Sequence, residues 1–361
     1  MSELLTFRSS RPSLRTSLAN LLDAVGAVDA ALFARRMVPM PFLPIITYHR
    51  VCGSRADHFD DGAVDASPAA FERHLDVLNR SFELIGTEQL RAHLWEGAPL
   101  PPNPAMITFD DGYRECHDVA LPILRRYGAR ATFFVATSFV TNRRMFWWDK
   151  ISYLVKSSRR RTFALSYPYG RAYVLGEHDR TPVIDKLLRI VKDHCGLDVE
   201  RFVDELASVL EVRWTTAIEE SFASSLIMSW DQIRALRDAG MDVESHTRTH
   251  RILHTLTPEE LESELAGSRD DLEDALDRPV CALAYPVGRS ITANARLCAA
   301  VAAAGYDLGF SSATGTNLLA EGIHPYDIHR LAVGGSDAYF RATMAFPTFA
   351  HPRRSHATEP Q

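Results

Sequence analysis

Short apolar segments that alternate with helical stretches constrain the fold of this chain more than any other feature of its sequence. Such alternation is typical of parallel β/α construction, because parallel strands need a crossover connection that is usually a helix. The predicted strands are residues 45–49, 82–85, 105–109, 131–136, 241–245, 280–285, 308–311 and 328–333. The predicted helices between them are residues 68–79, 87–95, 120–127, 230–239, 258–276 and 292–304. Seven or eight such units would close a barrel.

The segment from about residue 141 to 228 interrupts this alternation with a mostly helical pattern. It opens with the run Phe146, Trp147, Trp148 and Asp149. Insertions in barrels tend to come from loops above the active face, so these aromatic residues could form a sugar-binding wall. They could equally be buried and anchor the insertion to the barrel.

Residues 13–36 place leucines, valines and Phe33 at helical spacing, with arginines at both ends. This pattern predicts one amphipathic helix outside the catalytic core. It could dock on the main domain, bind a partner or touch a membrane surface. We therefore expect an N-terminal helical extension over 1–40, a barrel domain over 41–350 with the insertion at about 141–228, and a disordered tail over 351–361.

Composition restricts the class of protein and the partners it can have. With 46% hydrophobic and 24% charged residues, the chain is an ordinary globular protein. Its formal net charge of -6 gives no basic field for nucleic acid. Its five cysteines include no C-x-x-C pair, so neither a disulfide framework nor a thiolate zinc site is indicated. No signal peptide or transmembrane run is recognised, and we expect a cytoplasmic protein.

Two adjacent carboxylates end the apolar strand at 105–109. Asp110 and Asp111 are followed by Gly112, and two acids at a strand end are costly unless they are solvated, paired or bound to a metal. The carboxyl ends of barrel strands form the catalytic face, where one acid could bind a cation while the other faces the substrate. By itself, the same triplet also describes an ordinary turn.

Two histidines follow the strand predicted at 241–245. His246 and His250 are four residues apart, close enough on one helical turn to share a metal. Thr247 stands where the H-E-x-x-H motif of zinc proteases has glutamate, so this is a different pattern. Two imidazoles and one carboxylate leave positions open for water and substrate, although an isolated pair of this spacing is often structural. His254 continues the spacing and is interpreted as a structural or surface residue.

A third segment runs from a strand into a turn, as Ala284-Tyr285-Pro286-Val287-Gly288. Such a turn could direct a backbone N–H at the active face. A donor there would stabilise the oxyanion that forms when water adds to an amide carbonyl.

Together and in this order, the three segments resemble the polysaccharide deacetylases, carbohydrate esterase family 4. The first motif of that family is Thr-Phe-Asp-Asp-Gly, found here at 108–112, and its second is His-Ser/Thr-x-x-His, found at 246–250. The resemblance spans roughly 44–333 without the insertion. It implies a distorted (β/α)7–8 barrel with an N-terminal helix and a helical insertion.

The resemblance also implies roles for the site residues. Asp110 becomes the general base, and Asp111, His246 and His250 become the ligands of a divalent metal ion. Two imidazoles and a carboxylate favour Zn2+, although Co2+, Ni2+ or Fe2+ would fit the same ligands. The backbone N–H of Val287 becomes the oxyanion donor.

Two features depart from the most common family pattern. The third motif usually reads Arg-Pro-Pro-Tyr-Gly, so the arginine that orients the base is missing here, and Arg330 is our hypothesis for its replacement. A family subset in biofilm and exopolysaccharide production takes its general acid from a Tyr-His segment of the first strand and has an Ala-Tyr-Pro third motif. That arrangement favours His49 as the acid over His329, the late candidate.

The implied activity is removal of N-acetyl groups from N-acetylhexosamine units of a polysaccharide or its precursor, in exopolysaccharide or cell-envelope glycan biosynthesis. The expected partner is an N-acetylated glycan, and the N-terminal helix could contact membrane-associated polysaccharide synthesis machinery. One alternative is the same site acting on another amide or an O-acetyl ester. The other is a catalytically inactive glycan-binding protein, which the missing arginine favours.

Overall fold

A parallel, nearly closed barrel forms the centre of the molecule. The computed structural model describes residues 14–38, 41–53, 59–312, 317–333 and 336–346. The nine-stranded sheet has the order β14-β12-β11-β10-β7-β6-β2-β15, with β5 beside β6. Its strands are β2 (Ile45–Tyr48), β5 (Glu83–Leu84), β6 (Pro104–Phe109), β7 (Thr132–Val135), β10 (Asp242–Ser245), β11 (Ala282–Ala284), β12 (Leu308–Ser311), β14 (Ile328–His329) and β15 (Leu331–Ala332). Each predicted strand is found, with ends that differ by at most two residues.

One short segment closes the barrel. β14 pairs with β12, while β15 pairs with β2, and only Arg330 separates β14 from β15. The last strand therefore bridges the two edges of the sheet, which confirms the predicted (β/α)7–8 barrel.

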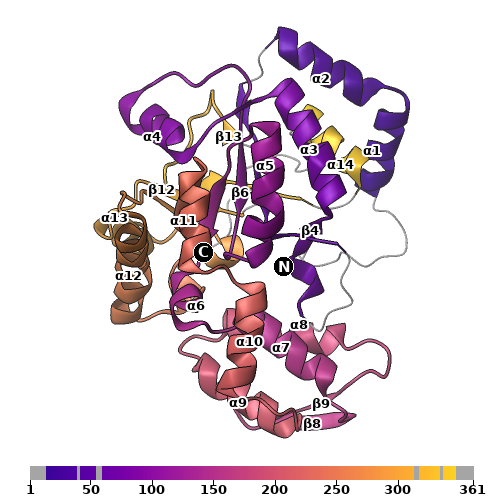
Figure 1. Ribbon diagram of the computed structural model, residues 1–361, viewed down its shortest axis with the longest axis vertical. Helices are drawn as coiled ribbons and strands as arrows, with labels where there is room; N and C mark the ends of the chain where they lie inside the picture. Colours follow the sequence, from indigo (N-terminus) through magenta and orange to yellow (C-terminus); the bar gives the residue numbers. More distant parts are fainter. Residues whose placement is uncertain (1–13, 39–40, 54–58, 313–316, 334–335, 347–361) are drawn as a thin grey trace, which may run out of the picture.

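Helices cover the outside of the barrel (Figure 1). They are α3 (Pro68–Ser81), α4 (Thr87–Glu96), α5 (Leu121–Tyr127), α6 (Thr137–Asn142), α11 (Trp230–Asp238), α12 (Pro258–Leu276), α13 (Ala295–Ala303) and α14 (Asp337–Ala345). Side-chain caps fix several starts, and Thr257 with Glu260 makes a capping box at the start of α12. Two small pairings complete this part, the antiparallel β1 (Phe42–Leu43) with β13 (Asn317–Leu318) and the parallel β3 (Arg50–Val51) with β4 (Val64–Ala66).

Alternation along each strand divides the core into two clusters. Ile45, Met106, Phe134 and Phe310 belong to one buried cluster, to which every long strand except β10 contributes. Neighbours of the first three on their strands, such as Ile46, Ile107 and Phe133, belong to the larger cluster beneath the helices. Since successive side chains of a strand point to opposite faces, the first cluster fills the barrel interior.

The insertion lies between β7 and β10 and forms the lower part of Figure 1. It contains α7 (Trp147–Ser157), α8 (Thr181–Asp193), α9 (Val199–Val209) and α10 (Thr216–Leu226), together with an antiparallel hairpin of β8 (Thr162–Leu165) and β9 (Arg171–Val174). The mostly helical pattern expected from the sequence did not include this hairpin. Trp147 and Trp148 are each only 7% exposed, so they anchor the insertion and do not form an open sugar-binding wall.

The N-terminal segment is two helices, which corrects the prediction of one. α1 (Leu14–Ala24) and α2 (Ala27–Met37) meet at a bend of 74°, where Gly26 has a φ of 74°. Glycine adopts this left-handed conformation without steric cost, so the helix breaks there. Arg35 fixes α2 to the barrel, since its guanidinium lies 3.7 Å from the Phe42 ring and donates to the Met344 carbonyl at 3.0 Å.

Among the described residues, no single helix is long and apolar enough to cross a membrane, and α1 and α2 reach that length and composition only as a bent pair. The predicted tail at 351–361 lies outside the described residues.

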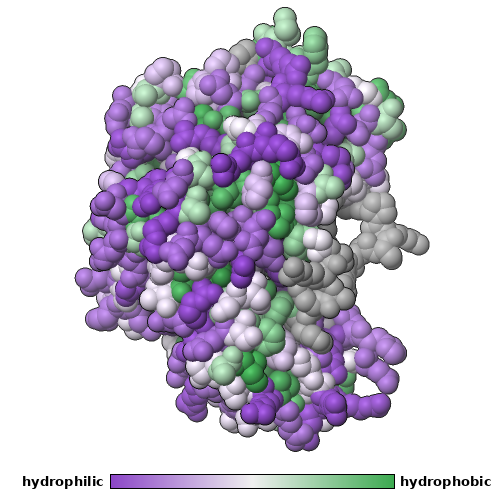
Figure 2. Space-filling view, viewed as in Figure 1, coloured by the Kyte–Doolittle hydropathy of each residue, from purple (hydrophilic) through white to green (hydrophobic). Residues whose placement is uncertain are grey.

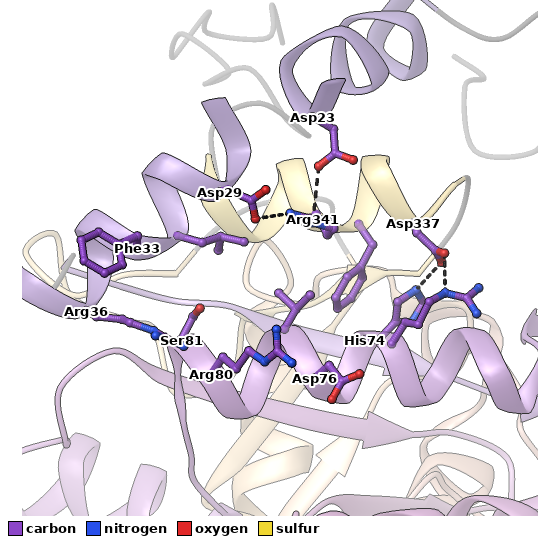
Figure 3. Close-up of a pocket in the computed structure, with 14 residues that line it drawn as sticks. Asp23, Asp29, Phe33, Arg36, His74, Asp76, Arg80, Ser81, Asp337 and Arg341 are labelled. Carbon is purple, nitrogen blue, oxygen red and sulfur yellow. Dashed lines mark hydrogen bonds and ion pairs between the residues drawn. The ribbon is translucent and has the colours of Figure 1, made fainter. Parts of the chain in front are cut away.

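A cavity of about 660 Å³ lies between α2, α3 and α14 (Figure 3). Arg341 pairs there with Asp23 and Asp29, and Asp337 pairs with Arg73 and His74. None of the predicted catalytic or metal-binding residues lines this cavity. It is a feature of how the N-terminal helices dock, and the chemistry is located elsewhere.

Candidate functional site

Strained backbone marks the carboxyl ends of three strands of the barrel. Asp111 after β6, Thr247 and His250 after β10, and Val287 after β11 all have φ between 56° and 71°. Residues other than glycine seldom adopt this left-handed conformation, and where they do, the strain clusters at functional sites. The three motifs expected from the sequence are therefore the places where the chain turns sharply at the carboxyl edge of the barrel.

Asp111, His246 and His250 form a group with the geometry of a metal site. One ligand atom from each lies within 4.8 Å of the others. The Nε2 atoms of His246 and His250 are each 3.5 Å from Asp111 Oδ1. That oxygen is buried and has no hydrogen-bond partner among the described residues, which fits a cation position.

The electrostatics of the three residues also fit a cation. Burial lowers the pKa of His246 to about 4 and holds that of His250 well below its usual value, so both imidazoles are neutral and have a free lone pair. Burial raises the pKa of Asp111 to about 7. A divalent ion would reverse that shift, since an opposite charge nearby favours the carboxylate. The set suits zinc and related divalent ions.

Asp110 is paired with Arg330, 220 positions later in the chain. The guanidinium donates two hydrogen bonds to the two carboxylate oxygens, at 2.7 and 2.9 Å, and both side chains are almost fully buried. Burial opposes ionisation of Asp110, but the charge and hydrogen bonds of Arg330, together with the charge of His49, outweigh it and lower the pKa to about 2. Asp110 is therefore ionised throughout the neutral range.

His49 follows β2 and is held by Asp65 on β4. Its Nδ1 lies 3.1 Å from Asp65 Oδ2, and its backbone N–H donates to the same oxygen. Burial disfavours the imidazolium, but the charge and hydrogen bond of Asp65, with smaller contributions from Asp111 and Asp110, raise the pKa of His49 to about 10. A histidine in this state carries a proton at neutral pH.

His329 lies on the other face of the barrel wall. It is a neighbour of Arg330, whose side chain points inward to Asp110, and successive residues of a strand face opposite ways. Its Nε2 is 3.4 Å from Asp327, and its side chain is 34% exposed. The structure thus groups His49, and not His329, with the two aspartates.

Val287 stands in a short turn, Pro286–Gly288, directly after β11. The Gly288 carbonyl accepts from the Ser312 N–H at 2.8 Å, and the Ser312 hydroxyl accepts from Arg330 at 3.2 Å. The turn is thereby tied to the Arg330–Asp110 pair.

Two supporting residues were missed from the sequence. Asp65 holds His49, and Glu264 on α12 accepts the backbone N–H groups of Arg248 and Thr249, at 2.9 and 2.8 Å, inside the loop between the two histidines. Each is remote in sequence from the motif that it supports, and only the fold brings them together. A buried glutamate in α12, a helix with charged residues on most faces, gives no distinct sequence signal.

His254 lies outside the cluster. It is exposed, and its Nε2 is 3.2 Å from Nη1 of Arg289, as expected for a structural or surface residue.

Comparison with known proteins identifies the family of this chain. The polysaccharide deacetylase family model matches residues 97–173 and 199–309, just over half of the chain. The Bacillus subtilis protein YxkH, whose name assigns it provisionally to the polysaccharide deacetylases, is 20% identical over 292 residues, covering 81% of this chain and 71% of its own.

Two solved structures share the fold. The Streptococcus pyogenes deacetylase PplD, in complex with acetate, is 18% identical and gives a TM-score of 0.54 over 85% of this chain and 99% of its own. IcaB from Ammonifex degensii is 17% identical and gives a TM-score of 0.53 over 85% and 98%. The family match, and the motifs gathered at one edge of the barrel, lead to one conclusion: this chain belongs to the polysaccharide deacetylases, a family of hydrolases.

Proposed function

We propose that this protein is a metal-dependent N-deacetylase acting on N-acetylhexosamine units of a polysaccharide or its precursor. One observation carries the proposal most directly: Asp110, held by Arg330 and ionised at neutral pH, and His49, held by Asp65 and protonated there, accompany one group of metal-ligand type. An ionised base and a charged acid are the two proton-transfer groups that amide hydrolysis needs.

Asp111, His246 and His250 would hold the divalent ion, with zinc as the first choice. When bound, the ion would polarise the acetyl carbonyl and make an adjacent water more acidic, which suits a base as weak as Asp110.

The residues of the chain supply the other steps. Asp110, oriented by Arg330, accepts a proton from the attacking water. The Val287 backbone N–H stabilises the oxyanion on the former carbonyl oxygen. His49 donates its proton to the sugar nitrogen as the C–N bond breaks, and the products are acetate and a free amine.

Acetate release from N-acetylglucosamine oligomers tests this function. We expect equal amounts of acetate and new primary amine from the native protein, and neither from Asp110→Asn, which keeps the metal ligands. Acetate without amine from an acetylated glycan would instead indicate an O-acetyl esterase. Oligomer binding without any product would indicate the inactive glycan-binding alternative, against which the Arg330–Asp110 pair already argues.

We also propose that α1 and α2 rest on an anionic lipid surface, as an enzyme of lipid-linked glycans would require. Seven large apolar side chains on this helix pair are exposed: Leu14, Leu18, Leu21, Val25, Phe33, Met37 and Val38. Figure 2 shows apolar side chains at its upper right edge, over these helices. Arg341 pairs with both Asp23 and Asp29, and exposed Arg15 and Arg36 lie on the same two helices, so this group of five charges has a net charge of +1. This combination favours anionic lipid.

Vesicle sedimentation distinguishes this contact from binding of a second copy. The native protein should sediment with phosphatidylglycerol vesicles, and Leu18→Glu with Phe33→Glu should abolish it. Val174→Glu, at an even more exposed apolar position in the insertion, should have no effect. Sedimentation unchanged by the double substitution, or a dimer that it disrupts, would contradict the proposal. A cytoplasmic location stays a prediction, and recovery mainly from periplasm or medium would overturn it.

A further inference from the structure

The two histidines of the metal group are oriented in different ways. His246 Nδ1 lies 2.8 Å from the Ala284 carbonyl, the usual arrangement for a metal-binding histidine. His250 Nδ1 is buried and has no hydrogen-bond partner among the described residues. His250 also has a φ of 56°, so its local backbone is not in a relaxed conformation. Something other than a hydrogen bond must therefore fix its ring.

The ring of His250 packs against Trp148, the second residue of the insertion helix α7. Their centroids are 4.6 Å apart at an interplanar angle of 55°. Trp148 is itself fixed on two sides, because its Nε1 donates to Tyr113 Oη at 2.7 Å and its ring stacks on Phe146 at 4.6 Å and 6°. The indole of Trp148 is therefore a fixed surface against which the imidazole of His250 packs.

Tyr113 is hydrogen-bonded to Asp149, which lies on the same helix, α7, as Trp148. Its hydroxyl donates to Asp149 Oδ2 at 2.9 Å, and Asp149, which is fully buried, also accepts the Asp60 N–H at 2.8 Å. A tyrosine hydroxyl has one proton, so donation to Asp149 leaves the oxygen to accept from Trp148. The order of donors is therefore Trp148 to Tyr113 to Asp149.

These contacts join α7 to the segment that carries Asp111 and to the segment that carries His250. Tyr113 stands two residues after Asp111, and Trp148 contacts His250. Trp147, although adjacent and equally buried, is farther from His250, at 6.2 Å, and its Nε1 has no partner among the described residues. The two neighbouring tryptophans therefore make different contacts.

We propose that Trp148 is a positioning residue for the metal ligand His250, held in place by Tyr113 and Asp149, so that the insertion completes the metal site. The inference rests on the proposed metal-dependent function and adds a role for a segment outside the three motifs. Trp148 acts through His250 and contacts no reacting atom in this account.

Cobalt binding tests the inference without any substrate. The Kd for Co2+ and the visible spectrum of the bound ion are measured for the native protein, Trp148→Leu, Trp148→Phe and the matched control Trp147→Leu. We expect Trp148→Leu to weaken binding about 10- to 100-fold, as the loss of a ligand's outer support does, with an altered spectrum. Trp148→Phe keeps an aromatic wall but loses the bond to Tyr113, and should weaken binding by less. Trp147→Leu should bind like the native protein.

Native affinity and spectrum in folded Trp148→Leu would overturn the inference while leaving the metal site intact. Equal losses in both leucine variants would also overturn it, because they would reflect general loosening of α7. If Trp148→Leu does not fold, the Kd of Trp148→Phe for Co2+ becomes the test. A Kd equal to that of the native protein would then overturn the inference. Absence of cobalt binding by the native protein would remove the proposed function itself together with this inference.

Discussion

Arg330 and Asp110 form a bidentate ion pair across the closure of the barrel, with N–O distances of 2.7 and 2.9 Å. Arg330 is the single residue between β14 and β15, so the break in the last strand coincides with the position of this side chain. This pair supports our proposal that Arg330 takes the role of the arginine that the third motif lacks.

Loss of the two hydrogen bonds from Arg330 to Asp110 should impair catalysis more than metal binding. We expect Arg330→Gln to lower kcat/KM about 100-fold, since the base is no longer held in its productive orientation. Arg330→Lys should restore only part of the activity, because an ammonium cannot make two parallel bonds. Kinetics alongside metal content check this, and a kcat/KM for Arg330→Gln within a few-fold of native would show that the pair is only structural.

Removal of Asp65 should move the alkaline limit of activity to lower pH. Burial disfavours the charged form of His49 and Asp65 restores it, so Asp65→Asn should return the pKa of His49 from about 10 to 6.5 or below. At pH 8 a histidine with a pKa of 6.5 is about 3% protonated, which predicts roughly 30-fold lower activity, largely recovered near pH 6.

The matched control for that experiment is Asp327→Asn, which removes the carboxylate beside His329. Its pH profile should keep the native alkaline limit. If Asp327→Asn shifts the limit and Asp65→Asn does not, His329 is the general acid and the assignment to His49 is wrong.

Glu264 should matter for stability through the loop that it holds. Glu264→Ala leaves two partly buried backbone donors, those of Arg248 and Thr249, without their charged acceptor, and we expect a loss of about 2–3 kcal/mol in the free energy of unfolding. Glu262→Ala, at an exposed position of the same helix, should stay within about 0.5 kcal/mol of native. Urea unfolding of the two variants makes the comparison, and equal midpoints would contradict the assigned role.

Much of the fold followed from the sequence, because buried parallel strands and amphipathic helices leave clear periodic patterns. The failures have local physical causes. Gly26 breaks the N-terminal helix because it has a positive φ, and a single glycine in a long apolar pattern is not enough to predict a bend. In the insertion, the hairpin of β8 and β9 has exposed residues between its buried ones, and β9 begins with Arg171, so it lacks the apolar run of a core strand.

The three metal-ligand candidates could be found from their motifs, whereas their supports could not. The sequence identified Arg330 only as a hypothesis. Strand alternation explains why its side chain faces Asp110: Ile328 and Arg330 share the inner face, while His329 points outward. Asp65 contacts His49, and Trp148 contacts His250. Both are tertiary contacts between separate segments of the chain, which no local sequence pattern predicts.

The most direct test of the central claim is the amount of divalent metal bound per chain, compared between the native protein and the double variant His246→Ala, His250→Ala. The account predicts about one zinc or similar ion in the native protein and none in the folded double variant. A folded native protein that binds no metal in excess zinc, cobalt or nickel would contradict it.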